Sequence, residues 1–230
     1  MDWLGPQEWQ AVRLSLQVAA WATLLSLPPG VWVAHLLARG QFPGRSVLNA
    51  LVHLPLILPP VVTGYLLLWV FGTQGPVGAV LEQFGLVLAF RWTGAVLAAA
   101  VMAFPLLVRA IRLSIEAVDP RLEQAGASLG ASPLAVFATV TLPLALPGIL
   151  AGMVLAFAKS MGEFGATITF VSNIPGQTQT LPTAVYAFLQ VPGGEASALR
   201  LVVISVVISM VALLGSEFLA RRVSRRGRVS

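Results

Sequence analysis

Charged side chains are rare inside the long apolar stretches of this sequence, and one pair of them has the spacing of an ion pair. Lys159 and Glu163 stand four residues apart in the segment AKSMGEFGA, which places them on one face if the segment is helical. Each charge alone would cost about 2.5–3.5 kcal/mol at the centre of a lipid bilayer. The pair therefore indicates either a functional site within a membrane or a structural ion pair between helix faces.

Other reactive chemistry is scarce. The sequence has no cysteine, which excludes disulfides, thiol chemistry and cysteine metal sites. His35 and His53 lie far apart in the sequence, which favours packing or interfacial positions over metal coordination. No segment matches the phosphate-binding pattern G-x-x-x-x-G-K-[ST], so the sequence predicts no ATP site of its own. We expect no bound cofactor and no enzymatic activity.

The composition predicts that the charged pair lies in an integral membrane protein. Hydrophobic residues make up 57% of the sequence and charged residues only 10%, against about 25% charged in a typical soluble domain. Continuous apolar runs favour a helical bundle over a β-barrel. We predict a single all-α transmembrane domain over residues 1–230 with five membrane-spanning helices. The spans cover about residues 14–37, 47–71, 92–112, 147–170 and 199–220.

The arginines predict the orientation of this bundle. If the N-terminus is outside, ten arginines fall in cytoplasmic segments and three in outer segments. The ten are Arg39, Arg45, Arg109, Arg112, Arg121, Arg221, Arg222, Arg225, Arg226 and Arg228, and the three are Arg13, Arg91 and Arg200. By the positive-inside rule, this bias favours an external N-terminus and a cytoplasmic C-terminus. Because most basic residues flank apolar runs, we expect no nucleic-acid partner.

A polar segment between the third and fourth predicted spans carries consistent helix-boundary signals. Asp119–Pro120 suits an N-cap followed by the first helical position, and Gly130 suits a left-handed stop. Ser132–Pro133 repeats the start signal, and the prolines within 142–147 predict a break before the fourth span. The result is a helix–glycine turn–helix hairpin within a loop of about residues 114–146. It either packs under its own bundle or docks a separate partner.

The segment QAGASLG…VTLP resembles the EAA loop of ABC-importer membrane subunits. That pattern is E-A-A, three residues, G, nine residues, I, one residue and L-P, and the spacing here matches throughout. Gln124 stands where Glu is usual, and Gly126 replaces the second Ala. Glu123 is one residue early and is a candidate for the acidic role, although its side chain would point about 100° away. The resemblance implies that the ATPase-coupling residues are Glu123, Gln124, Ala125, Gly126, Gly130, Ala131, Ser132, Pro133, Val140, Leu142 and Pro143.

The resemblance extends over nearly the whole chain. The segments HLPLILPPVVTGYLLL, AAAVMAFPLLVRAIRLSIEAVD and GEFGATITFVSNIPGQTQTLPTAVY are similar to the permeases of bacterial molybdate importers. Sulfate importer permeases are similar mainly around EFGATITFVSNIPG. The resemblance implies a type I ABC-importer subunit of the bacterial cytoplasmic (inner) membrane, working as a homodimer on two ATPase subunits. An external oxyanion-binding protein would deliver molybdate or tungstate, with sulfate or another oxyanion as the alternative.

With an oxyanion as the implied cargo, the polar residues of the predicted spans become candidates for its route. Lys159 could attract the anion, but Glu163 one turn away would cancel much of its field, which favours a structural ion pair. Thr63, Thr167 and Thr169 could donate hydrogen bonds to the anion, or they could bond the carbonyls of their own helices.

Two further functions compete with an ATP-driven importer. A proton-coupled secondary transporter would use Glu163 as its proton site, but such transporters are built from inverted repeats, and the sequence has none that we can recognise. A structural membrane anchor would have no use for the proline-rich second span or for the hairpin. All three functions place the chain in a lipid bilayer.

Overall fold

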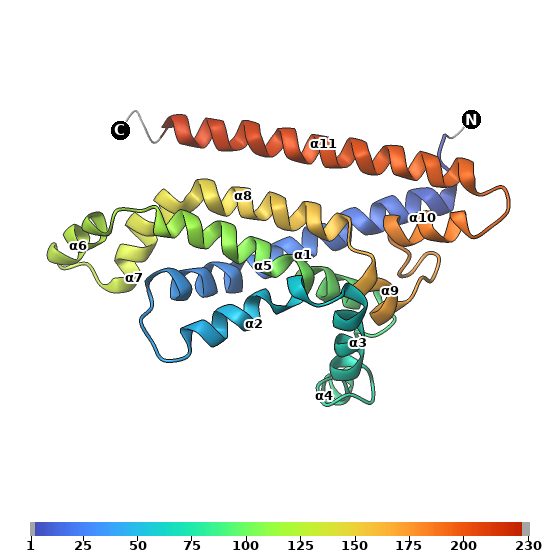
Figure 1. The fold of residues 1–230 in the computed structure, drawn as a ribbon, viewed down its shortest axis with the longest axis horizontal. Helices are drawn as coiled ribbons and strands as arrows, with labels where there is room; N and C mark the ends of the chain where they lie inside the picture. The colour runs from blue at the N-terminus through green and yellow to red at the C-terminus, as the bar shows by residue number, and fades with distance from the viewer. Residues whose placement is uncertain (1–2, 227–230) are drawn as a thin grey trace.

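The structure, a computed structural model, describes residues 3–226 and is helical over that range with no strand. Four long helices run roughly alongside one another (Figure 1). They are α1 (Pro6–Arg39), α5 (Trp92–Glu116), α8 (Leu142–Met161) and α11 (Glu195–Arg226). The all-α prediction is confirmed. Outside the described part lie Arg228 of the predicted basic tail and the side chains of Arg221, Arg222, Arg225 and Arg226.

Small residues let the three central helices α1, α5 and α8 approach one another closely. Ala19 and Ala34 of α1 and Ala98 of α5 have no solvent-exposed surface. A side chain added at Gly152 of α8 would begin 3.2 Å from Leu107 of α5. Because lipid tails are as apolar as the side chains, close van der Waals packing through small residues is a main source of helix association in membranes.

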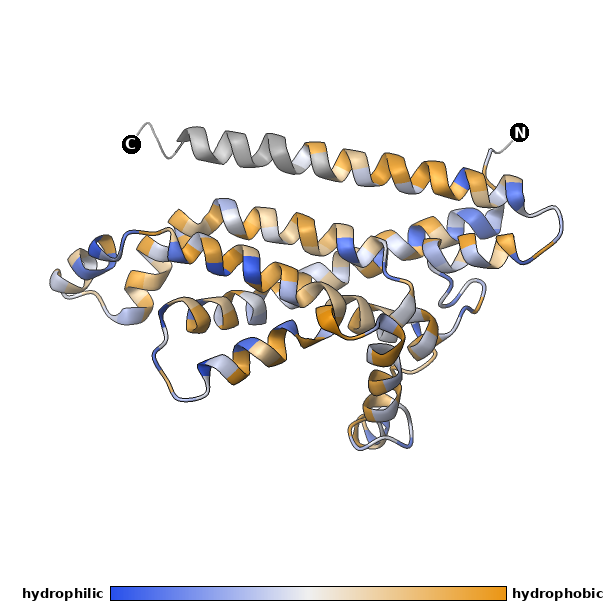
Figure 2. Ribbon diagram, viewed as in Figure 1, coloured by the Kyte–Doolittle hydropathy of each residue, from blue (hydrophilic) through white to orange (hydrophobic). Residues whose placement is uncertain are grey.

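The hydropathy of the helices fits a membrane bundle. Four rods, residues 6–39, 92–116, 133–161 and 195–212, are each long and apolar enough to cross a bilayer. A fifth crossing exists only if a bent helix pair is counted as one span. Figure 2 shows hydrophobic residues along the long helices and hydrophilic residues gathered around α6 (Pro120–Ser128). The first rod begins before the predicted start near residue 14, because its helix extends beyond the apolar part.

The second predicted span, residues 47–71, is not one helix. It consists of α2 (Arg45–Ile57) and α3 (Pro60–Phe71), which meet at an angle of 114°. Leu58 and Pro59 between them are extended, with ψ of 143° and 133°. The residue before a proline avoids the helical region, so the tandem prolines end one helix and start another. As a result, α3 projects away from the bundle (Figure 1).

The fourth predicted span, residues 147–170, has different ends in the structure. α7 (Pro133–Val136), a π-helical turn η1 (Phe137–Thr141) and α8 form one continuous rod, so the predicted break within 142–147 is wrong. In η1 the Leu142 N–H donates to the Phe137 carbonyl, five residues back. This wide turn precedes Pro143 and accommodates its missing N–H, because π-turns re-satisfy carbonyls that a proline leaves free. The rod ends at Met161, and a separate α9 (Gly165–Val171) follows.

Two short helices lie away from α6. α4 (Gly78–Gln83) lies at the tip of the projecting α3, and α10 (Leu181–Leu189) packs against α11 and α1 at the end of the bundle opposite α6 (Figure 1). The bundle therefore has one end formed by the hairpin of α6 and α7 and another formed by α10 and the starts of α1 and α11. The candidate site residues divide between the hairpin end and the contact between α3 and α9.

Candidate functional site

The hairpin is built by the capping residues that the sequence provides. The Asp119 carboxylate accepts a hydrogen bond from the Arg121 N–H at 2.9 Å and caps α6. The Ser132 hydroxyl accepts one from the Ala135 N–H at 3.3 Å and caps α7. Gly130 between them has φ of +86°, a left-handed conformation that other residues rarely adopt. Both predicted helix starts and the glycine turn are thus present in the structure.

The two arms of the hairpin contact each other through Gly126. A side chain added there would begin 3.4 Å from Val136 and 3.7 Å from Val140, so only a small residue fits without displacing the second arm. Ala131 follows the turn and donates its N–H to the Gly126 carbonyl at 3.2 Å. Leu142 and Pro143 start α8 directly beyond η1, so the second arm continues into a membrane-spanning rod.

The outer surface of the hairpin is apolar at two prominent positions. Leu129 is 90% exposed and Leu134 is 76% exposed, one on each side of the turn. Gln124 and Ala125 are exposed on the same arm as Leu129, and none of the residues of α6 is buried. Large apolar side chains exposed on an otherwise polar element are typical of a surface that contacts another protein.

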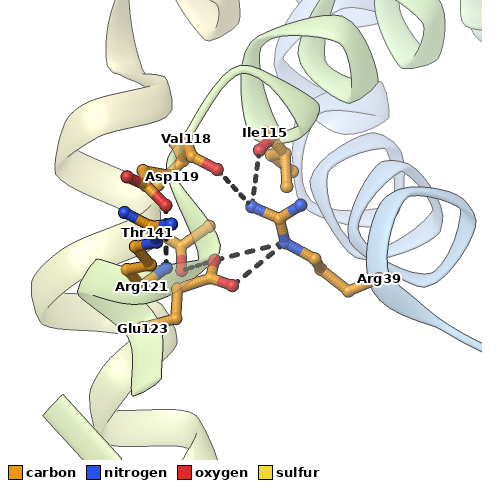
Figure 3. Close-up of polar contacts among 7 residues, drawn as sticks. All are labelled: Arg39, Ile115, Val118, Asp119, Arg121, Glu123 and Thr141. Carbon is orange, nitrogen blue, oxygen red and sulfur yellow. Dashed lines mark hydrogen bonds and ion pairs between the residues drawn. The ribbon is translucent and has the colours of Figure 1, made fainter. Parts of the chain in front are cut away.

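Glu123 points toward the chain's own bundle (Figure 3). Its carboxylate forms an ion pair with Arg39, with Nε to Oε2 at 3.0 Å, and accepts a hydrogen bond from the Thr141 hydroxyl at 2.7 Å. Only 19% of its side chain is exposed. The residue at the usual Glu position, Gln124, is the exposed one. The carboxylate one position early is therefore engaged internally.

Arg39 is a site residue that sequence reasoning missed. Its Nη2 atom donates to the carbonyls of Ile115 at 3.0 Å and Val118 at 2.8 Å, at the C-terminal end of α5. Ile115 is in the last turn of α5, where carbonyls lack an i+4 partner, and Val118 follows two residues after the helix. The sequence identified Arg39 only as a topology signal. Its place in the last turn of α1 was a signal for carbonyl capping, but its partners lie more than seventy residues away in sequence.

Lys159 and Glu163, the charged pair predicted in the fourth span, form an ion pair in the structure. Lys159 Nζ lies 2.7 Å from Glu163 Oε2, and the second carboxylate oxygen accepts the Ala166 N–H at 3.0 Å. The two residues do not share a continuous helix, because Lys159 is in the last turn of α8 and Glu163 is in the break before α9. Glu163 is almost fully buried, with 2% of its side chain exposed, and Lys159 is 30% exposed.

The three candidate threonines lie on α3 and α9, which pack against each other. Thr169 donates its hydroxyl to the Gly165 carbonyl of its own helix at 2.8 Å. Thr167 is buried, and the buried hydroxyl of Thr63 has no hydrogen-bond partner among the described residues. A side chain at Gly64 would begin 2.6 Å from the Ala166 carbonyl oxygen, so the two backbones are in close contact. The structure does not bring these residues near the hairpin.

A helical membrane bundle with a capped hairpin at one end agrees with what comparison with known proteins shows. The family described as "binding-protein-dependent transport system inner membrane component" matches residues 26–225. The chain belongs to this family. It is therefore a multi-pass permease of the bacterial inner membrane, a transporter component rather than an enzyme.

Curated relatives of the permease cover nearly its full length. The molybdenum transport system permease protein ModB of Escherichia coli K12 is 60% identical, over 95% of this chain and 96% of that protein. ModB of Haemophilus influenzae is 56% identical, with the same coverage of both chains. The sulfate transport system permease protein CysT of Salmonella typhimurium is 34% identical, over 96% of this chain and 80% of that protein.

Solved structures share the fold of the permease. A bacterial ABC transporter that imports alginate has a TM-score of 0.75 at 18% identity, covering 95% of this chain and 80% of that one. An inward-facing form of the MetNI methionine ABC transporter has a TM-score of 0.67 at 16% identity, covering 94% of both chains. These likenesses support the type I ABC-importer architecture expected from the sequence.

Proposed function

We propose that this permease is the membrane-spanning subunit of an ATP-driven molybdate importer, in which two copies form the translocation pathway. The 60% identity to a molybdenum transport permease supports molybdate as the cargo. The 34% identity to a sulfate permease makes sulfate the weaker candidate. Tungstate, a tetrahedral dianion like molybdate, is expected to share the route.

The hairpin is the proposed docking element for a separate ATPase subunit. The observation that carries this proposal is the exposure of Leu129, directly after α6, and of Leu134, in α7, on a capped hairpin whose first helix has no buried residue. The sequence has no P-loop, so the energy for transport comes from a partner or an ion gradient, and the exposed hairpin favours a partner. Two exposed leucines beside a rigid turn would fill a groove on that partner and bury their apolar surface.

The proposed orientation follows from the same assignment. The hairpin end lies in the cytoplasm, where ATP is available, and so does the C-terminus. The N-terminus and the end that holds α10 then face outward, where an external oxyanion-binding protein delivers its anion. The distribution of arginines supports this orientation by the positive-inside rule.

We assign the Lys159–Glu163 pair a structural role rather than an anion-binding one. At 2.7 Å, the carboxylate neutralises the ammonium group, so a passing dianion would meet little net positive charge. The carboxylate also holds the Ala166 N–H at the start of α9. The pair thus ties the end of α8 to α9 across a helix break. Thr63, with its unpartnered hydroxyl, remains the best-placed of the threonines to donate to an anion.

Co-purification and uptake test this function. The permease is expressed with its ATPase and reconstituted in liposomes with its binding protein, and uptake of labelled molybdate is measured with tungstate and sulfate as competitors. Gly130→Pro should abolish recovery of the ATPase, because proline cannot adopt φ of +86° and loses the N–H that bonds Ala127.

Gly85→Pro is the matched control for this substitution. Gly85 has φ of +74°, also donates its N–H to a carbonyl three residues back, and lies in the segment after α4, away from the hairpin. The Gly85→Pro variant should retain the ATPase. Recovery of the ATPase with the Gly130→Pro variant would contradict the docking assignment. Uptake blocked by sulfate but not by tungstate would contradict molybdate as the cargo.

A further inference from the structure

At the hairpin end of the bundle, Arg39 and the Glu123 carboxylate connect the ends of three long helices. Arg39 ends α1, and its guanidinium bonds both the Glu123 carboxylate and the carbonyls at the end of α5. Thr141, the last residue before α8, donates its hydroxyl to the same carboxylate. Figure 3 shows the guanidinium between Glu123 on one side and the two carbonyls on the other. Arg39, Glu123 and Thr141 are called the clamp below.

The clamp is the main polar attachment of α6 to the rest of the bundle. None of the residues of α6 is buried, and its apolar contact with the second arm runs through Gly126. An element without a buried face gains little from hydrophobic packing and must be held by its polar contacts. Thr141 is buried, and the exposed fractions of Arg39 and Glu123 are below a quarter, so water screens these contacts only partly.

The geometry of the guanidinium makes this attachment stiff. Its planar fork of five donors bonds acceptors from two segments at once, which fixes the direction of α6 relative to α1 and α5. Without the clamp, the hairpin would still move α8, because α7 and α8 belong to one continuous rod, but it could turn without moving α1 and α5. A hairpin held by the clamp carries α1 and α5 along with α8, and such rigid-body movement is a usual element of switching transitions.

We propose that Arg39 is a positioning residue for transport, and that the clamp transmits movement of the hairpin to α1 and α5. The proposal rests on the proposed function, because it requires an ATPase that moves the hairpin. Without the clamp, the ATPase would still dock and hydrolyse ATP, but its movement would reach α8 without α1 and α5. The acidic side chain of the hairpin then serves inside this chain, and Leu129 and Leu134 make the contact with the ATPase.

The test measures molybdate taken up per ATP hydrolysed by the complete importer in liposomes, together with the recovery of the ATPase. Arg39→Gln and Glu123→Gln should each lower uptake per ATP about tenfold, within the usual range of coupling between two sites. The double variant should be no worse than either single one, because each removes the same ion pair. Thr141→Val keeps the ion pair and should lower the ratio only about twofold.

Glu116→Gln is the matched control. Glu116 pairs with Arg112 at 2.8 Å, also near the hairpin end, but both residues belong to α5. Glu116→Gln should leave uptake per ATP unchanged, because the ion pair lies within α5 and Arg112 keeps its hydrogen bond to Asn49 of α2. Retained ATPase, retained hydrolysis and a lowered ratio in the clamp variants support the proposal.

Three results would overturn it. These are an unchanged ratio in Arg39→Gln and Glu123→Gln, loss of the ATPase from these variants, and single effects that multiply in the double variant. Failure of the proposed function is distinguishable, because the unmodified permease would then recover no ATPase or would take up molybdate without ATP.

Discussion

Two ion pairs of this permease, one inside the bundle and one at the hairpin end, differ in what they join. Lys159 and Glu163 are four residues apart and bridge a break between successive helices. Arg39 and Glu123 are 84 residues apart and connect α1 to the hairpin. The first pair fixes a local bend inside the membrane bundle, and the second fixes an exposed element to it.

The backbones pack more closely near the Lys159–Glu163 pair than in the hairpin held by the Arg39–Glu123 pair. The α3–α9 contact near Glu163 has backbones in close contact at Gly64, whereas Gly126 in the hairpin meets only valine side chains at ordinary distance. We therefore expect substitutions near Glu163 to change stability and substitutions in the clamp to change coupling. Four pairs of variants test this division, measured as melting temperature in detergent and molybdate uptake per ATP.

The largest stability difference is expected between Glu163→Ala and Glu123→Ala. Glu163→Ala leaves Lys159 unpaired and frees the Ala166 N–H, and breaking a buried pair costs about 3–5 kcal/mol. Glu123→Ala should cost only about 1–2 kcal/mol, because Arg39 keeps its bonds to the carbonyls of Ile115 and Val118. Uptake per ATP should fall with Glu123→Ala. Equal losses of melting temperature would remove the distinction between the two pairs.

Glycine substitutions should give the next largest difference. In Gly64→Ala the new methyl group would begin 2.6 Å from the Ala166 carbonyl oxygen, so α3 must shift, at about 1–3 kcal/mol. Gly126→Ala places its methyl group 3.4 Å from Val136 and should change the melting temperature little. Thermal unfolding of both purified variants checks this. A more destabilised Gly126→Ala would show that the hairpin is the tighter contact.

Lys159→Gln should have a moderate effect. Its neutral amide can still donate to the Glu163 carboxylate, so the expected cost is about 1–2 kcal/mol, and uptake per ATP should stay within about threefold of normal. Arg112→Gln, which loses a partly exposed pair with Glu116 and a hydrogen bond to Asn49 of α2, is the control for loss of a cation elsewhere. Uptake lost by Lys159→Gln with normal assembly would instead place the lysine on the anion route.

Thr169→Val should have the smallest effect. Its hydroxyl bonds only the Gly165 carbonyl of its own helix, so removing it should cost less than about 1 kcal/mol and leave molybdate uptake within twofold. Thr63→Val, with no bond to lose within the described structure, is the companion variant. A selective loss of uptake in Thr63→Val would assign that hydroxyl to the pathway.

Local signals allowed the sequence to predict the helices and the hairpin turn, and long-range contacts explain what it missed. Caps at Asp119 and Ser132 and the left-handed Gly130 act within a few residues, so their outcome is readable from the sequence. The path of the chain at Pro59 and at Pro143 could not be predicted from the prolines alone. Pro59 breaks a span, whereas Pro143 follows a π-turn that accommodates it. The clamp could not be predicted from the sequence, because Arg39, Val118 and Thr141 come together only after the bundle has formed.

The natural absence of cysteine allows the most direct test of the central claim, that the hairpin end docks the ATPase. Leu129→Cys places a thiol at the most exposed leucine of the hairpin, and Leu189→Cys places one at an exposed leucine at the end of α10. Each variant is labelled with a short photo-crosslinker in the assembled importer, and crosslinked products are identified by mass spectrometry. We predict a product with the ATPase from position 129 and none from position 189. An ATPase product from position 189 and none from 129 would contradict the account.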